Sequence, residues 1–162
     1  MRVSLTAPSS WFAQNFSESF LVDAVLAGEL ALPVDTVAEP FVDAEDIADV
    51  VVAALTGAAP RNIVYDVTGP TALTFRDAAA KIAEATGRPL KFQSISPGQF
   101  GNNLRAHGTP EEVIAMLIEL FTTTLDGRNS SVAGGVQDAL GRDPRGFDVY
   151  AARAAASGVW NP

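Results

Sequence analysis

The segment from Glu39 to Gly57, EPFVDAEDIADVVVAALTG, constrains the fold most, because it predicts a short buried strand that leads into an amphipathic helix. The apolar pair Phe41-Val42 follows a proline and supplies the extended residues. Asp43 stands at the N-cap position, and Asp46, three residues later, indicates an acidic variant of the capping box. Gly57 is a natural residue to end this helix.

The predicted helix carries one apolar stripe at i, i+3, i+4, i+7 spacing, formed by Ile47, Val50, Val51 and Ala54. Its acidic residues are expected at the N-terminal end and on the solvent side: Glu45, Asp46 and Asp49. The pattern predicts a helix packed on a hydrophobic core, and it does not by itself indicate a reaction.

Strand-like and helix-like segments alternate along the rest of the chain, which predicts a single α/β domain over residues 1–162. The expected strands cover residues 3–7, 30–32, 63–67 and 90–95. The expected helices lie within residues 11–27, 74–86, 97–107, 110–125 and 147–156. Because the strand over 63–67 is almost continuously apolar, it suits a parallel sheet covered on both faces.

Two helix starts carry clear N-terminal signals. Ser96-Pro97 and Thr109-Pro110 each place a capping hydroxyl before a proline at the first helical position. Glu112, three residues after Thr109, predicts a capping box at the second of these helices.

The composition excludes several classes of protein. The chain has no cysteine, which rules out disulfides and thiol nucleophiles and fits a cytoplasmic protein. A net charge of −8, from 11 basic and 19 acidic residues, argues against a nucleic-acid surface. No apolar run is long enough to span a bilayer. With 48% hydrophobic residues, the chain is expected to expose apolar surface for a second copy or a partner chain.

Most catalytic signatures are absent from the sequence. There is one histidine, His107, and no HExxH, GxSxG, P-loop or GxGxxG motif. His107 precedes Gly108 at an expected helix end, where an imidazole meets the last carbonyls. Tyr65 and Tyr150 lack a lysine four residues later and are expected to pack in the core or an interface. We predict no metal site, and the pattern identifies no catalytic residue.

The charged clusters have simple explanations. The acidic residues from Asp43 to Asp49 could form a metal site or an acid/base pair, but helix capping and the helix dipole account for them. Four arginines could bind a phosphate, but acidic residues accompany them in the sequence. A solvated face of mixed charge is therefore expected at Arg128, Arg142, Arg145 and Arg153.

Residues 8–16 are the most site-like stretch. They follow the carboxyl end of a predicted strand, where open α/β sheets place their ligands. Their small hydroxyls, amide groups and flat rings can together hold a planar organic molecule, although the rings could equally belong to the core. The expected substrate-binding residues are Trp11, Phe12, Asn15 and Phe16.

Four motifs in order resemble the carboxyl-terminal half of the NmrA-like atypical short-chain dehydrogenases. They are Pro-x-x-Trp-Phe-x-Gln-Asn-Phe at 8–16, Pro-Phe-Val-Asp-x-Glu-Asp-Ile-Ala at 40–48, Tyr-Asp-x-Thr-Gly-Pro at 65–70 and Leu-Gly-Arg-x-Pro-Arg-x-Phe at 140–147. The resemblance implies a partial Rossmann-like parallel sheet, NAD(P) as the cofactor, and a role in nucleotide binding for Pro8, Ser9 and Ser10.

The glycine-rich nucleotide-binding half of that family is missing from these 162 residues. Three hypotheses follow. The chain is the substrate-binding half of an NAD(P)-dependent oxidoreductase that needs another chain to bind the nucleotide; or it is a cofactor-independent cyclase or isomerase that uses the inherited pocket; or it is a non-catalytic binding or dimerisation module.

Overall fold

The computed structural model describes residues 4–6, 11–60 and 62–161. Its strands are β1 (Ser4–Thr6), β2 (Glu29–Leu32), β3 (Ala38–Glu39), β4 (Val64–Asp66), β5 (Leu73–Thr74) and β6 (Lys91–Ser94). Its helices are α1 (Asn15–Glu18), α2 (Val22–Ala27), α3 (Ala44–Thr56), α4 (Phe75–Thr86), α5 (Pro97–Ala106), α6 (Glu111–Glu119) with the π-helical turn η1 (Leu120–Thr124), α7 (Gly135–Leu140) and α8 (Phe147–Ser157). The α/β fold class is therefore confirmed.

The described strands form three separate pairs and not one sheet. β1 pairs with β4 and β2 pairs with β6, both in parallel, whereas β3 and β5 are antiparallel. The parallel pairing agrees with the predicted Rossmann-like arrangement. The pairs are not joined because the central strands expected of such a sheet are not among the described residues.

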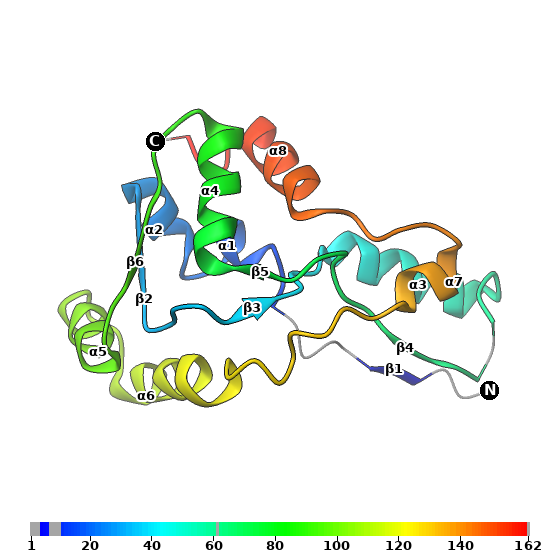
Figure 1. Ribbon diagram of the computed structural model, residues 1–162, viewed down its shortest axis with the longest axis horizontal. Helices are drawn as coiled ribbons and strands as arrows, with labels where there is room; N and C mark the ends of the chain where they lie inside the picture. The colour runs from blue at the N-terminus through cyan, green and yellow to red at the C-terminus, as the bar shows by residue number, and fades with distance from the viewer. Residues whose placement is uncertain (1–3, 7–10, 61, 162) are drawn as a thin grey trace.

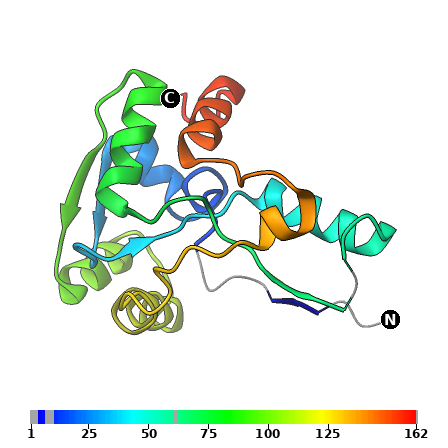
Figure 2. The same cartoon turned by 45° about the vertical axis from the view of Figure 1, so that its right-hand side comes forward.

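The buried side chains form two clusters at different ends of the molecule (Figure 1). The larger cluster is rich in aromatic rings and is enclosed by α4 and α8, which lie side by side, together with β2, β6 and the α5–α6 hairpin. The smaller cluster lies between β4, α3 and α7, and its members are mostly valine and alanine. Figure 2 shows the same two parts after a rotation. The part with β1 and β4 therefore has only a small core of its own.

β4 is covered on one face only. Tyr65 points into the smaller cluster and is 1% exposed, whereas Val64 on the opposite face is 56% exposed. The expectation that residues 63–67 are covered on both faces is therefore wrong for this chain, because α3 and α7 pack on one side and no described element packs on the other.

Two predicted helix starts differ from the structure. Residues 11–13 are not helical: Phe12 forms a parallel bridge with Val42, and Ala13 lies in the turn that leads into α1. The helix after Thr109 begins at Glu111, since Pro110 has the extended ψ of 145° and occupies the N-cap position without a side-chain cap. The predicted capping box of Thr109 and Glu112 is therefore wrong, whereas the cap of Ser96 is confirmed, with Gln99 closing its box.

Candidate functional site

The predicted site segment is described from Trp11 onward, since Pro8, Ser9 and Ser10 lie outside the described residues. Trp11 to Ala13 run beside Val42: the Ala13 amide donates to the Val42 carbonyl over 2.8 Å, and the Val42 amide donates to the Trp11 carbonyl over 3.0 Å. Side chains in an extended segment alternate. Trp11 consequently points into the core and Phe12 points out of it.

Trp11 and Phe16 are core residues in this structure. The Trp11 ring lies 5.2 Å from Phe75 and 5.1 Å from Phe121, between ring centroids. Phe16 is fully buried and packs edge-to-face against Phe41 and Phe147. Edge-to-face contacts of this kind add to the stabilisation that burial provides. Neither side chain lines a groove, so both support the site wall from behind.

Phe12 and Asn15 line an open groove of about 520 Å³ between α1 and the start of α3. The Phe12 ring is 40% exposed and offers a flat apolar surface. The other residues around the groove are Gln14, Glu18, Ser19, Ala44, Glu45 and Ala48. One exposed ring beside amide, hydroxyl and carboxylate groups can hold a planar molecule and fix its orientation. The structure thus brings together two of the four residues that the sequence predicted for substrate binding.

Gln14 holds the groove wall in place. Its Nε2 donates to Asp43 Oδ1 over 2.7 Å, and its Oε1 accepts from the Ala44 amide over 3.0 Å. Asp43 Oδ1 also accepts from the Glu45 amide, which confirms the predicted N-cap. The Gln14 side chain therefore links the start of the short helix α1 to the N-terminus of α3.

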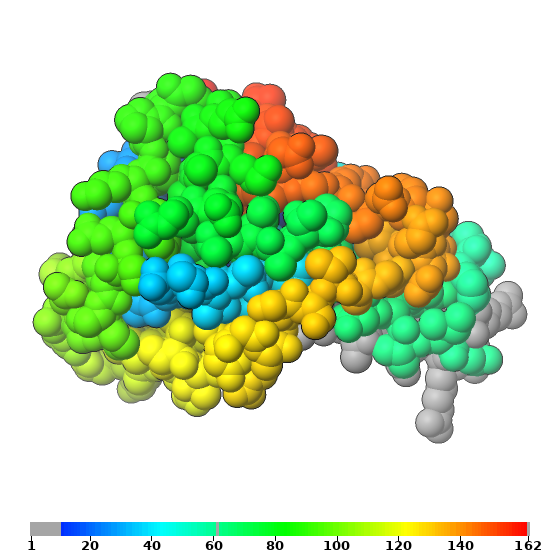
Figure 3. Space-filling view, in the orientation of Figure 1, coloured from blue at the N-terminus to red at the C-terminus, as the bar shows by residue number. Residues whose placement is uncertain are grey.

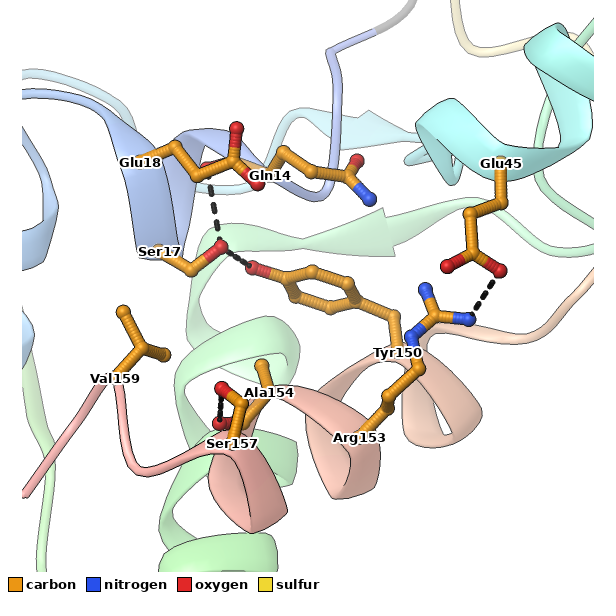
Figure 4. A pocket seen from close by; sticks show the side chains of 9 residues that line it. All are labelled: Gln14, Ser17, Glu18, Glu45, Tyr150, Arg153, Ala154, Ser157 and Val159. Atoms are coloured by element: carbon orange, nitrogen blue, oxygen red, sulfur yellow. Dashed lines mark hydrogen bonds and ion pairs between the residues drawn. The ribbon is translucent and has the colours of Figure 1, made fainter.

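A second pocket of about 210 Å³ adjoins the groove and shares Gln14, Glu18 and Glu45 with it. Figure 4 shows Tyr150 reaching from α8 to Ser17, with the hydroxyl groups 2.7 Å apart. Burial raises the pKa of Tyr150 far above its usual range. A phenol that is neutral at all physiological pH values and already hydrogen-bonded acts as a structural tie between α8 and α1, in agreement with the predicted packing role.

The acidic start of α3 is paired with arginines from the end of the chain. Asp46 is fully buried and accepts from Arg145 and from Arg142, the latter over 2.8 Å. Arg153 donates to Asp43 over 2.7 Å and to Glu45 over 2.6 Å.

Two predictions about these charges are wrong. Asp46 is neither solvent-facing nor part of a capping box, because its carboxylate turns away from Asp43 towards the segment between α7 and α8. Arg142, Arg145 and Arg153 do not form a loose solvated face, since each pairs with carboxylates of α3 or of its N-cap Asp43. Only Arg128 behaves as expected: it pairs with its neighbour Asp126 at the surface. The arginine cluster thus holds the last helix onto α3.

Neither a metal centre nor a membrane helix emerges among the described residues. No three His, Asp or Glu side chains of residues 11–60 and 62–161 converge on a position that could hold a metal ion. His107 caps α5, with its Nδ1 2.7 Å from the Asn103 carbonyl oxygen. None of the helices in the described ranges is long and apolar enough to cross a bilayer.

The chain spans about half the length of the curated relatives it matches. An NAD(P)H azoreductase of Xenophilus azovorans is 35% identical over 133 residues, which make up 82% of this chain and 46% of that protein. The prestalk A differentiation protein A of Dictyostelium discoideum is 26% identical over 141 residues, 87% of this chain and 47% of that protein. No family model matches the sequence.

A solved structure shows the same fold. The triphenylmethane reductase of Citrobacter sp. superposes with a TM-score of 0.77, covering 91% of this chain and 51% of that one at 18% identity. These similarities agree with the predicted resemblance to the carboxyl-terminal half of the NmrA-like atypical short-chain dehydrogenases. The chain corresponds to about half of a family member, and NAD(P) is the cofactor that the family implies.

One residue of this NmrA-like chain escaped the sequence analysis. Glu39 is fully buried in β3, and neither of its carboxylate oxygens has a hydrogen-bond partner in the described structure. The signal was present in the sequence: Glu39 lies two residues before Phe41, and extended residues two apart share a face. An acidic residue on the same face as a core phenylalanine is expected to be buried.

Proposed function

We propose that this chain is the substrate-binding half of an NAD(P)-dependent oxidoreductase and that another chain supplies the nucleotide-binding half. The observation that carries this proposal is a group of exposed apolar side chains, which we call the β4–α3 patch and define as Val52 and Leu55 on α3 together with Ile63 and Val64 at β4. Val64 lies on the face of β4 that α3 does not cover. All four are large apolar side chains at the end of the molecule that contains the smaller core, with exposed fractions of 58%, 69%, 40% and 56%.

The side chains of the patch are of the apolar kind that is usually buried inside a domain. Parallel strands are almost always buried on both faces, and a two-stranded sheet is marginal by itself. Exposed apolar surface of this kind marks a surface that binds another protein. A partner that packs on the exposed face of β4 would cover Val64 and give the sheet its second covering layer, and relatives about twice as long as this chain support that interpretation.

The substrate groove would lie on this half. Phe12 offers its exposed ring to one face of a planar molecule, and the Asn15 amide offers both a donor and an acceptor. Trp11 and Phe16, behind the wall, would keep the position of Phe12 fixed. The substrate class proposed here, a small planar organic molecule, rests on those two side chains.

The N-terminus of α3, beside the groove, does not fit the pyrophosphate of NAD(P). A dinucleotide needs a glycine-rich turn at a helix N-terminus that is free to receive negative charge. The N-terminus of α3 is instead capped by the Asp43 carboxylate and carries Glu45 and Asp46 in its first turn. A phosphate would be repelled there, so nucleotide binding is assigned to the other chain.

Native mass spectrometry with NADPH tests the proposal. The purified chain alone is expected to take up no NADPH. When it is mixed with the amino-terminal half of the Xenophilus azovorans azoreductase, expressed separately, a complex of the two polypeptides that holds one NADPH is expected. Stoichiometric NADPH binding by the chain alone would contradict the need for another chain.

The β4–α3 patch also favours a second outcome in the same experiment, the non-catalytic dimerisation module. One such result would be a dimer of the chain that takes up no NADPH and forms no complex with the azoreductase half. It would indicate that each copy covers the β4–α3 patch of the other. That result would replace the oxidoreductase proposal with a self-associating binding module.

A further inference from the structure

Glu39 is an unusual residue for a protein interior. It is 0% exposed, and both of its carboxylate oxygens lack a hydrogen-bond partner within the described residues. A buried carboxyl without a partner costs free energy, and the cost is far larger when the group is ionised. None of the interactions assigned to the site or to substrate binding uses this residue.

The segment from Asp126 to Ala133 lies over the strand that carries Glu39. Ser130 Oγ donates to the Ala38 carbonyl over 2.6 Å, next to Glu39 in β3. The Ala133 amide donates to Thr68 Oγ1 over 2.9 Å and fastens the other end of the segment. Figure 3 shows this segment, in yellow and orange, crossing the surface beside the segment that contains β3. One hydrogen bond to β3 and one to Thr68 therefore hold the segment in place.

We infer that Glu39 and the segment Asp126–Ala133 form a proton-dependent latch. The segment is closed over β3 while the Glu39 carboxyl is protonated, and it opens when the carboxyl ionises and requires water. This inference does not depend on the proposed oxidoreductase function.

The charges around Glu39 favour the protonated form. Burial, and secondarily the Asp126 carboxylate, raise the pKa of Glu39 from 4.5 to about 7. Asp126 is itself paired with the exposed Arg128, which holds the pKa of Asp126 at about 2 and keeps it ionised. β5, the strand paired with β3, contributes the uncharged Leu73 and Thr74. Within the part of the chain that the structure describes, no cation contributes to the pKa of Glu39.

The direction of the pH dependence follows from proton binding. Between pH 4.5 and about 7 the closed form holds a proton on Glu39 that the open form has lost. Raising the pH through this window therefore favours the open form. Below it the latch is fully stabilised, and above pH 7 the stabilisation is lost. From pH 5 to pH 9 the equilibrium constant for opening should increase by a factor on the order of 100.

Hydrogen exchange measured by mass spectrometry tests the latch with the whole chain. The matched variant is Glu39→Gln, which has the shape of the protonated residue and cannot ionise. Comparing the two proteins at the same pH removes the intrinsic pH dependence of exchange. At pH 5, peptides covering residues 125–134 should exchange at rates that differ by less than about fivefold between the two proteins. At pH 8.5 they should exchange on the order of 100-fold faster in the wild-type chain.

Two results would overturn the inference. Equal exchange of residues 125–134 in wild type and Glu39→Gln at every pH would show that Glu39 does not control the segment. Equal loss of protection across α4 and α8 at high pH would show global unfolding and not a local latch. If Glu39→Gln does not fold, Asp126→Asn serves instead: removing this neighbouring negative charge lowers the pKa of Glu39 in the closed form, so the exchange transition should be complete at a lower pH and should be smaller. An unchanged transition would contradict the latch.

Discussion

Gly69 lies where two backbone segments approach too closely for any side chain. A Cβ on this residue would stand 2.1 Å from the Phe41 carbonyl oxygen, which is well inside van der Waals contact. The Gly69 amide donates to the Pro40 carbonyl over 3.0 Å. Because Phe41 belongs to the larger core and Val67 to the smaller one, this contact joins the two cores.

Gly69→Ala is expected to lower the free energy of unfolding by about 3 kcal/mol, since the new methyl group must displace backbone and cannot be accommodated by a side-chain rotation. Chemical denaturation followed by circular dichroism measures the change. Gly98→Ala in α5 is the matched control, because its Cβ would meet only Ser96 Oγ at 4.0 Å. It should stabilise the chain by roughly 0.5–1 kcal/mol through helix propensity. Equal effects of the two variants would contradict the argument.

The burial of a single residue, Asp46, is also the point at which the sequence-based prediction fails most clearly. Asp46 was predicted to face solvent because it is charged, but its spacing to Val50 and Ala53 places it on the buried face of α3. The burial of Asp46 could therefore have been predicted from this spacing alone. Its partners could not be predicted, since Arg142 and Arg145 lie 96 and 99 residues away along the chain and reach Asp46 only through the tertiary fold.

At the scale of elements, helix α4 begins with a complete capping box. Thr74 Oγ1 accepts from the Asp77 amide over 3.1 Å, and Asp77 Oδ2 accepts in return from the Thr74 amide over 3.0 Å. Thr74→Ala should lower the free energy of unfolding by about 1 kcal/mol, because it leaves an amide at the helix start without a partner.

Thr109→Ala is the control for the Thr74 variant. The sequence predicted the same box at Thr109, but the helix there starts one residue later and has no side-chain cap. The control should change the unfolding free energy by no more than a few tenths of a kcal/mol. Urea titrations of both variants measure the difference, and a cost at Thr109 as large as at Thr74 would show that the predicted box forms after all.

Most helices and strands could be predicted from the local sequence pattern, but the way in which they pair and pack together could not. The C-terminal glycines Gly28, Gly57, Gly87 and Gly158 end their helices in the left-handed conformation, as expected from their positions. Residues 11–13 read as helix but pair with Val42, about 30 residues later, and that competition is invisible in a local window. The candidate groove was located by its position after a strand, whereas its wall depends on the distant Asp43 held by Gln14.

At the scale of the whole molecule, the two cores differ in how complete they are. The larger core contains a network of aromatic contacts and is closed by α8, whose end is tied down by the Trp160 indole donating to the Phe16 carbonyl over 2.8 Å. The smaller core has one aromatic residue, Tyr65, and lies beside the β4–α3 patch. The molecule is therefore well packed at the end with the larger core, and it exposes apolar side chains at the end with the smaller core.

The β4–α3 patch should make the isolated chain self-associate, because apolar side chains and an open strand edge both favour pairing with a second copy. Sedimentation velocity across a dilution series should show a concentration-dependent increase in sedimentation coefficient. Leu55→Glu combined with Val64→Lys should abolish it, since each charge would have to be desolvated in the contact. Met116→Glu is the matched control: Met116 is 58% exposed on α6, at the well-packed end, so this variant should associate as the wild type does. Association that survives in the double variant but is lost in Met116→Glu would place the contact on the α5–α6 hairpin and remove the patch as the surface that a partner covers.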